Sequence, residues 1–334
     1  MSSERRRRSS RLGAHPERRI LTPVRRAALR HAVEDRSVPW LPFRRRSRTR
    51  FVVLAPVVNM HARPRVSSAV VSQAILGMSV VMMKRRLGWA LVETPDRYRG
   101  WIRTPALRPD RRRMPVVEVR SLLANIYAAR DVTTRAPIAV LPMLARVEVA
   151  ANSGPVRGSG HEARAGGAAV EDWVRVHLPD GRRGWAQSAD VSAPIGTAGR
   201  RALARSPGRS AAVVSMALRF LGLPYLWGGI TTFGLDCSGL VQLAHRALGI
   251  VLPRDADLQW ADRRLSPVAA ASIRPGDLVF FGPRRGAITH VGIAIGRRAF
   301  VNATTRHRPE VRIERLDDPY WKRLFRGARR LPGD

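Results

Sequence analysis

The chain has 334 residues, of which 60 are Lys or Arg and 25 are Asp or Glu, so its formal net charge is +35. A chain of this length has room for two or three domains, and hydrophobic residues make up 45% of it, enough to form their cores. No run of about 18 apolar residues occurs, so we expect no membrane-spanning helix.

The positive charge has more than one interpretation. Clustered cations bind nucleic acid by releasing counterions from phosphates, but here the arginines are scattered through every segment. No zinc-finger spacing or helix-turn-helix pattern is present, so we expect no specific nucleic-acid partner. An arginine bias of the proteome, or attraction to an anionic substrate such as a cell-wall polymer, would also explain the charge. The sequence leaves its role and the oligomeric state open.

Residues 1–50 are expected to form a disordered, Arg-rich arm, with charge runs at residues 5–8 and 44–46. This segment lacks the continuous apolar stretch of a secretory signal. That feature favours a cytoplasmic location, whereas a misassigned start codon would allow a secreted or cell-wall-associated protein.

Two β-rich segments follow, at residues 51–110 and 115–193. Each consists of short strand-like runs separated by Gly, Pro and Asp. Trp89 and Trp101 of the first segment recur as Trp173 and Trp185 in the second, which also carries a Gly- and Ala-rich insertion at residues 152–169. An internal repeat of this size predicts two small modules rather than one large sheet. The tryptophans are expected to be core aromatics of small barrels.

The chain changes character after a segment rich in Pro, Gly, Ala and Arg at residues 194–210, which we interpret as a linker. Apolar residues from Val213 to Leu221 have helical spacing, and Gly222 is a suitable stop. Residues 211–332 are therefore expected to form a third domain that contains both helices and strands.

The single cysteine, Cys237, follows a glycine-containing loop and precedes an amphipathic run from Leu240 to Leu248. This position predicts a sulfur at the first turn of a helix, where unpaired N–H groups and the helix dipole favour a thiolate. One cysteine allows no intramolecular disulfide, and a lone cysteine is usually a small buried hydrophobe. It becomes a candidate nucleophile only together with a distant histidine.

His290 begins a strand-like run, and Asn302 lies in the next one. A helix that carries Cys and packs on a sheet that carries His is the papain arrangement, in which the imidazole takes the thiol proton and later donates it to the leaving amine. Asn302 could then fix the tautomer of His290. In the alternatives, His290 is an incidental strand-end residue, His245 is a packing or solvated residue, and His307 competes for the third position. The dispersed histidines lack zinc-ligand spacing, so no metal or organic cofactor is expected.

The segments DCSGLV, RPGDLVFF, HVGIAIG and FVNA occur in this order and together resemble the NlpC/P60 family of bacterial cell-wall cysteine peptidases. The resemblance covers about residues 210–330 and implies a papain-like α+β domain. It implies that the catalytic residues are Cys237 and His290, with Asn302 where the family more often has His. In PYLWGG, Tyr225 matches a tyrosine that lies beside the thiol as an oxyanion or substrate contact.

The two β-rich modules resemble bacterial SH3-like barrels, and their combination with this domain resembles the γ-D-glutamyl-L-diamino-acid endopeptidases. In that subgroup the first module lies across the cleft and substrates carry a free N-terminal L-Ala. The substrate-binding residues that this resemblance implies are Tyr98, Asp236, Ser238, Arg254 and Asp255. Ala256 departs from the subgroup's usual Ser. Asp236 could instead be a helix cap.

The sequence therefore predicts an α+β protein with a papain-like peptidase domain preceded by two small SH3-like β-barrels. The expected reaction is hydrolysis of the γ-D-glutamyl–diamino acid bond in peptidoglycan-derived peptides through a thioester. An amidase or acyltransferase with the same residues, and a non-catalytic wall-binding protein, are the alternatives. The preferred diamino acid, and the choice between free peptide and intact wall, remain open.

Overall fold

The computed structural model of the chain describes residues 49–150, 173–193, 199, 208–284 and 286–332. The expected N-terminal arm before residue 49, the insertion at residues 152–169 and most of the expected linker lie outside these ranges. Among the helices that the model describes, none is both long enough and apolar enough to cross a membrane.

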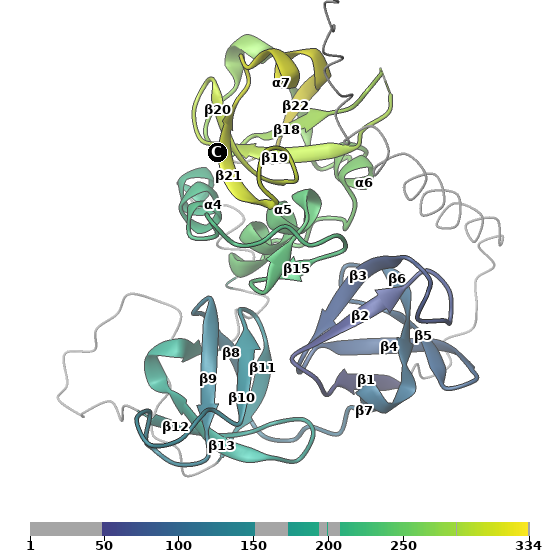
Figure 1. The fold of residues 1–334 in the computed structure, drawn as a ribbon, viewed down its shortest axis with the longest axis vertical. Coiled ribbons are helices and arrows are strands. Elements are labelled where there is room, and N and C mark those ends of the chain that lie inside the picture. Colours follow the sequence, from purple (N-terminus) through teal and green to yellow (C-terminus); the bar gives the residue numbers. More distant parts are fainter. Residues whose placement is uncertain (1–48, 151–172, 194–198, 200–207, 285, 333–334) are drawn as a thin grey trace, which may run out of the picture. The chain divides into compact units, whose positions relative to one another are not determined.

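The first module is a seven-stranded antiparallel sheet, coloured purple and blue in Figure 1. Its strands are β1 (Arg50–Val53), β2 (Val57–His61), β3 (Val70–Ile75), β4 (Ser79–Arg86), β5 (Trp89–Glu93), β6 (Arg99–Arg103) and β7 (Leu107–Pro109). They are arranged in the order β3-β2-β6-β5-β4-β1-β7. Valine, isoleucine and methionine side chains fill its interior, as expected for short strands with one buried face.

The second module repeats this topology strand for strand. It comprises β8 (Val116–Val119), β9 (Leu123–Tyr127), β10 (Ala139–Pro142), β11 (Arg146–Val149), β12 (Trp173–His177), β13 (Arg183–Gln187) and β14 (Val191–Ser192). Its order, β10-β9-β13-β12-β11-β8-β14, is that of the first module with each strand number raised by seven. The internal repeat read from the paired tryptophans is thus a repeated fold.

The four tryptophans do not all occupy the core. Trp89 is buried, but Trp101, Trp173 and Trp185 are only half-buried. Trp185 lies under the guanidinium of Arg130, 4.2 Å from the ring centroid, which is the geometry of a cation–π contact. The prediction that the tryptophans are core aromatics is therefore confirmed for Trp89 alone among the four. Aliphatic residues form most of the buried core of both modules.

The C-terminal part is built around a six-stranded sheet, shown in green to yellow in Figure 1. Its order is β17-β22-β18-β19-β20-β21, formed by β17 (Ser266–Val268), β18 (Leu278–Phe281), β19 (His290–Ala294), β20 (Ala299–Thr304), β21 (Glu310–Arg315) and β22 (Phe325–Arg330). The helices are α4 (Arg209–Leu218), α5 (Cys237–Ala247), α6 (Ala256–Trp260) and α7 (Pro319–Leu324). A two-stranded ribbon, β15 (Ile230–Thr231) and β16 (Gly234–Leu235), precedes α5.

Both faces of this sheet are covered, which explains the uninterrupted apolar run of β18. Leu278 and Phe280 belong to the apolar cluster that contains α5, whereas Val279 and Phe281 belong to a second cluster that contains Trp321 of α7. Successive strand residues point to opposite faces, so all four are buried.

One apolar core runs from the first module into the C-terminal part, and the second module, whose own apolar core is separate, adds Leu144 to it. A single cluster of buried residues contains Val53 and Ile75 of the first module, Leu144 of the second, and Val241 of α5. The two modules also meet at Gly77, where a Cβ atom would lie 1.9 Å from the carbonyl oxygen of Arg146. Glycine is required there for the backbones to approach, and its φ of +75° also favours it.

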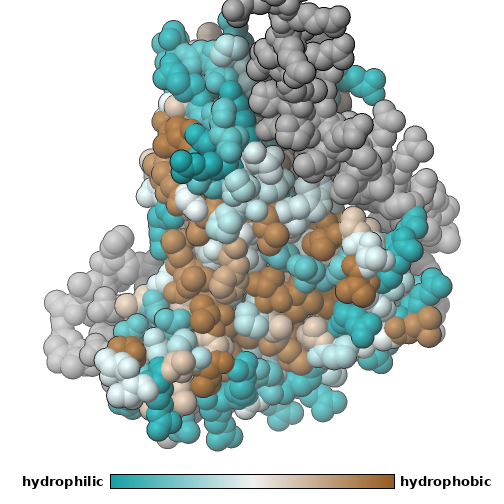
Figure 2. All heavy atoms as spheres, in the orientation of Figure 1, coloured by the Kyte–Doolittle hydropathy of each residue, from teal (hydrophilic) through white to brown (hydrophobic). Residues whose placement is uncertain are grey.

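The surface is less uniform than the net charge suggests. On the face drawn in Figure 2, hydrophilic residues cover the upper and outer parts, and hydrophobic residues gather between them. Exposed large hydrophobic residues in the described ranges include Leu226 and Phe233, in the segment that leads to Cys237.

Candidate active site

Cys237 is the first residue of α5, as the sequence predicted. The preceding residue, Asp236, is the N-cap, and its Oδ1 accepts a hydrogen bond of 2.7 Å from the backbone N–H of Gly239. Gly239 cannot carry a side chain, because a Cβ atom there would lie 2.0 Å from the carbonyl oxygen of Gly229. The DCSG sequence thus supplies a cap, a sulfur at the positive end of the helix, and a glycine that lets the preceding loop pack closely.

His290 and Asn302 lie on neighbouring strands, β19 and β20, and α5 packs against both. Nε2 of His290 and Oδ1 of Asn302 are 2.8 Å apart. The amide nitrogen of Asn302 donates to the carbonyl oxygen of Arg312, which directs the amide oxygen towards the ring. An amide oxygen only accepts, so Nε2 must carry the hydrogen and Nδ1 of the neutral ring keeps its lone pair. This tautomer has a basic nitrogen on the side away from Asn302.

Trp321 of α7 was not singled out from the sequence, yet it stacks on His290. The two ring centroids are 5.0 Å apart at an interplanar angle of 26°, and Trp321 is 2% exposed. Phe281 lies against the same imidazole at 5.8 Å. Together with the completely buried Asn302, these rings hold the imidazole orientation and keep water from the His290–Asn302 hydrogen bond.

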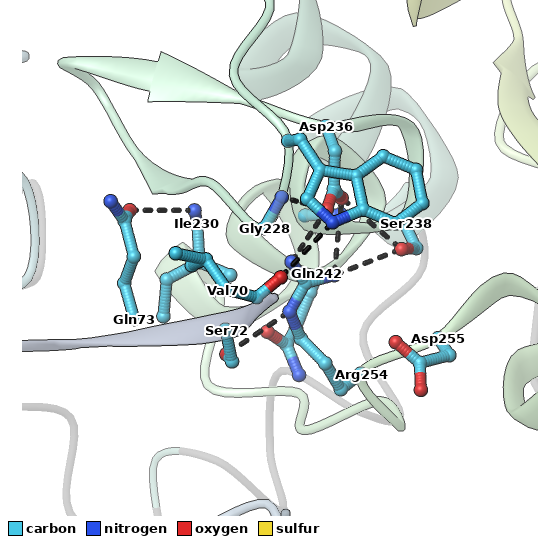
Figure 3. Close-up of polar contacts among 12 residues, drawn as sticks. Val70, Ser72, Gln73, Gly228, Ile230, Asp236, Ser238, Gln242, Arg254 and Asp255 are labelled. Carbon is cyan, nitrogen blue, oxygen red and sulfur yellow. Dashed lines mark hydrogen bonds and ion pairs between the residues drawn. The ribbon is translucent and has the colours of Figure 1, made fainter. Parts of the chain in front are cut away.

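Asp236 and Ser238, which flank the cysteine, are joined to Arg254 in a buried network (Figure 3). Nη2 of Arg254 lies 2.6 Å from Oδ2 of Asp236, and Nη1 donates to Oδ1 of Asp236 and to Oγ of Ser238. Nε of Arg254 donates across to Oγ of Ser72 on β3, at 3.1 Å. Arg254 is 1% exposed, so this geometry favours an internal role for it over direct contact with substrate.

Tyr98 and Asp255, expected from the resemblance to act on substrate, meet across the junction between the first module and the C-terminal part. The Tyr98 hydroxyl donates to Oδ2 of Asp255 at 3.0 Å. Asp255 is also the N-cap residue of α6, but its side chain makes no capping hydrogen bond. Its carboxylate is directed at the module instead of at its own helix.

Burial and neighbouring charges set the protonation of this pair. Burial raises the pKa of Asp255 to about 6, although the positive charge of Arg254 lowers it. Burial, and then the negative charge of Asp255, raise the pKa of Tyr98 well above its usual value. At neutral pH the pair therefore consists of a neutral phenol and a carboxylate that is costly to keep ionised.

The turn that carries Tyr98 is held by a second contact. Nε2 of Gln242, on the face of α5 one turn after Ser238, donates to Asp96 at 2.7 Å and to the carbonyl oxygen of Leu252 at 3.0 Å. On β3, Gln73 accepts from the backbone N–H of Ile230, and the Val70 carbonyl oxygen accepts from the Trp227 indole (Figure 3). Sequence reasoning missed Gln242, Ser72 and Asp96, because the role of each depends on a contact between distant segments.

The remaining candidates are placed as follows. Tyr225 pairs with Leu235, two residues before Cys237, and its backbone N–H donates to Pro309. His245 is a packing residue whose Nδ1 is 2.8 Å from the Val241 carbonyl oxygen, and burial lowers its pKa to about 4. His307 lies exposed in the loop between β20 and β21, so Asn302 and not His307 contacts His290.

A cysteine at a helix start, packed on a sheet that carries a histidine oriented by an amide, is the arrangement of papain-like cysteine peptidases. Comparison with known proteins agrees with this class. Residues 222–330 match the NlpC/P60 family, and residues 60–107 match the bacterial dipeptidyl-peptidase Sh3 domain. The chain therefore carries an NlpC/P60 domain preceded by a domain of this SH3 type.

Two curated relatives illustrate the match. A γ-DL-glutamyl hydrolase of Bacillus subtilis (strain 168) is 41% identical over 137 residues, which are 40% of this chain and 32% of that protein. A γ-D-glutamyl-L-lysine dipeptidyl-peptidase of Bacillus cereus (strain ATCC 10987 / NRS 248) is 32% identical over 158 residues, 47% of this chain and 45% of that protein. The chain thus spans less than half the length of either relative.

One solved structure extends the likeness to most of the fold. An NlpC/P60 family protein from Bacillus cereus ATCC 10987 superposes with a TM-score of 0.67 and covers 85% of this chain and 99% of that one, at 20% sequence identity. At this identity the likeness concerns the fold alone.

Proposed function

We propose that the protein is a cysteine peptidase that hydrolyses the bond between D-γ-glutamate and a diamino acid in peptidoglycan stem peptides that have a free N-terminal L-Ala. The observation that carries the proposal is the Tyr98–Asp255 pair, a phenol from the first module and a carboxylate from the C-terminal part. It provides a negative charge that suits a substrate ammonium, and Asp255 directly follows Arg254, which contacts both neighbours of Cys237.

The acidic pair sets the length of peptide that would be accepted. Asp255 follows Arg254, whose guanidinium contacts both neighbours of Cys237, so an ammonium bound at Asp255 lies only a short peptide away from the sulfur. We expect a dipeptide on the acyl side to reach from Asp255 to Cys237, with Tyr98 of the first module beside the bound N-terminus. The names of the Bacillus dipeptidyl-peptidases support the same length.

The proposed reaction uses the tautomer of His290 described above. Nδ1 accepts the proton of the Cys237 thiol, and the sulfur attacks the γ-carbonyl carbon of D-glutamate. The C–N bond then breaks, the imidazolium donates its proton to the leaving amine, and a thioester remains. Water, deprotonated by His290, hydrolyses the thioester and regenerates the thiol. The Nε2–H···Oδ1 bond to Asn302 stabilises the ring in both states.

The test is product analysis with L-Ala-γ-D-Glu-diamino acid tripeptides. The wild-type chain is expected to release L-Ala-γ-D-Glu, and Cys237→Ala is expected to fold normally and lose at least a thousandfold in kcat/KM. Acetylation of the peptide N-terminus removes the ammonium and should reduce kcat/KM by about a hundredfold, the loss expected for a desolvated ion pair of roughly 3 kcal/mol. Full turnover by Cys237→Ala, or equal turnover of the acetylated peptide, would refute the proposal.

A further inference from the structure

All three guanidinium nitrogens of Arg254 already donate hydrogen bonds within the protein, which does not suit an arginine that binds substrate. Its guanidinium forms a two-point ion pair with Asp236, through Nη1 at 3.1 Å and Nη2 at 2.6 Å. The same Nη1 donates to Ser238 at 3.0 Å, and Nε donates to Ser72 at 3.1 Å. With 1% of its surface exposed, it is among the largest fully buried side chains of the described chain.

The Asp236 carboxylate needs this partner for an electrostatic reason. Asp236 is 8% exposed and directly precedes the cysteine. An uncompensated carboxylate at this position would oppose formation of a thiolate, because a like charge nearby disfavours the charged form. Its two backbone donors, Gly239 and Gly228, satisfy hydrogen bonds but carry no full positive charge. Arg254 supplies that charge.

The other charged or titratable groups around the start of α5 cannot replace Arg254 as the source of positive charge beside Asp236. Asp255 is negative, and Tyr98 is neutral, and both couple electrostatically to Arg254. His290 approaches from β19 and becomes positive only when it has taken a proton. Arg254 is therefore the permanent cation of this group. Burial by itself would lower the pKa of its guanidinium, but the negative charges of Asp236 and Asp255 raise that pKa above its usual value.

We propose that Arg254 is a positioning residue that neutralises Asp236 beside the nucleophile and, through Ser72, ties the start of α5 to the first module. The inference rests on the proposed role of Cys237 as nucleophile. It goes further in assigning to Arg254 the task of keeping the neighbouring thiol ionisable, instead of a contact with substrate. Asp236 is correspondingly a helix cap and the partner of Arg254.

The test uses the fact that the chain contains one cysteine, so alkylation by iodoacetamide reports on Cys237 alone. The alkylation rate is measured from pH 5 to pH 9 on the full chain, without any substrate. Arg254→Met leaves the Asp236 charge uncompensated and is expected to slow alkylation at pH 7 by about tenfold, equivalent to about one pH unit in the midpoint of the profile. The double variant Arg254→Met/Asp236→Asn removes both charges and should return to within about threefold of wild type.

The direction in which Asp236→Asn alone changes the alkylation rate decides between the two roles. Asparagine caps helices as well as aspartate does, so the hydrogen bond to Gly239 can persist while the negative charge is removed. The remaining Arg254 cation should then favour the thiolate and speed alkylation at pH 6 by several-fold. If the pair were merely structural, both single variants would slow alkylation and the double variant would not recover, and either result would overturn the proposal.

A matched control comes from Arg330 and Asp277, a second two-point pair in the same domain, with distances of 2.7 Å and 2.8 Å. Arg330→Met also strips a buried aspartate of an arginine but should leave the alkylation profile unchanged. If Arg254→Met does not fold, as judged by circular dichroism, Asp236→Asn and the double variant still decide the question. Absence of peptidase activity in wild type, with the alkylation pattern as expected, would refute the proposed function and leave this inference intact.

Discussion

The two β modules have the same strand order but different neighbours, and one turn shows the difference. Between β5 and β6 the first module has Thr-Pro-Asp-Arg-Tyr, and between β12 and β13 the second has Leu-Pro-Asp-Gly-Arg. Tyr98 of the first turn bonds to Asp255, whereas Arg182, at the matching position of the second, pairs with Asp180 of its own turn. Asp96 accepts a hydrogen bond from Gln242 of α5, whereas its counterpart Asp180 accepts one from Arg182 of its own module.

The backbone of this turn is nevertheless conserved between the copies. Arg97 and Gly181 occupy matching positions, and both have positive φ, 68° and 97°. One backbone therefore serves both turns, and the side chains at two matching positions decide whether the turn bonds to the C-terminal part or stays within its own module. The comparison teaches that the contacts of this turn depend on side-chain chemistry more than on topology.

Among the variants that test this comparison, the largest effect should come from Asp255, the partner of Tyr98. Asp255→Asn removes the charge proposed to bind the substrate ammonium, and kcat/KM for the free tripeptide should fall by about a hundredfold. The pKa of Asp255 is raised to about 6, so wild type should lose activity as the pH falls through 6 and the carboxylate takes up a proton. Asp255→Asn should lack this step in a profile of kcat/KM from pH 5 to pH 8. Asp180→Asn, in the second module, is the control and should retain the wild-type profile; a wild-type profile without the step would contradict the assignment.

A smaller effect separates the two turns directly. Tyr98→Phe deletes one hydrogen bond to the Asp255 carboxylate, which contributes about 1.5 kcal/mol, and should lower kcat/KM by up to about tenfold. Arg182→Gln changes the matching residue of the second module and should stay within twofold of wild type. Equal losses in the two variants, measured on the same tripeptide, would show that the modules are not distinguished at this turn.

The smallest effect tests the shared backbone. Arg97→Gly should raise the free energy of unfolding by up to about 1 kcal/mol, because glycine adopts the left-handed backbone of this position without strain. Loss of the Arg97–Glu93 ion pair should cost little, because Glu93 keeps its pair with Arg99. Gly181→Ala places a side chain at a φ of +97° and should cost about 1 kcal/mol, although no atom lies within 4 Å of the new Cβ. Urea denaturation measures the change in the free energy of unfolding for each variant. Changes of the same sign in the two variants would mean that the two turns do not share a left-handed backbone at this position.

The sequence predicted the parts of this site that local pattern determines. A glycine loop before an amphipathic run predicted Cys237 at a helix start. Two strand-like runs predicted His290 beside Asn302, and Nε2 of His290 lies 2.8 Å from Oδ1 of Asn302. The repeat of the tryptophan-bearing strands predicted two copies of one module, which the strand orders confirm. These features rest on periodicity and caps within short segments.

Contacts between distant segments were beyond that reasoning. Ser72 and Arg254 are 182 positions apart, and Asp96 and Gln242 are 146 apart, so nothing local marks either pair. Tyr98 and Asp255 came from the resemblance alone. Trp321 follows Tyr320 in an ordinary-looking segment, and its stacking on His290 depends on how α7 covers the sheet. Tertiary packing decides such roles.

The apolar cluster that runs from Val53 through Leu144 to Val241 bears on how such a chain can change over evolutionary time. Accessory modules on flexible tethers can be lost or exchanged between genes without harm to their neighbours. Here, deletion of the first module would expose apolar side chains of the C-terminal part that it now covers, and exposed apolar surface promotes aggregation. The first module and the C-terminal part are thus expected to unfold together, as one cooperative unit.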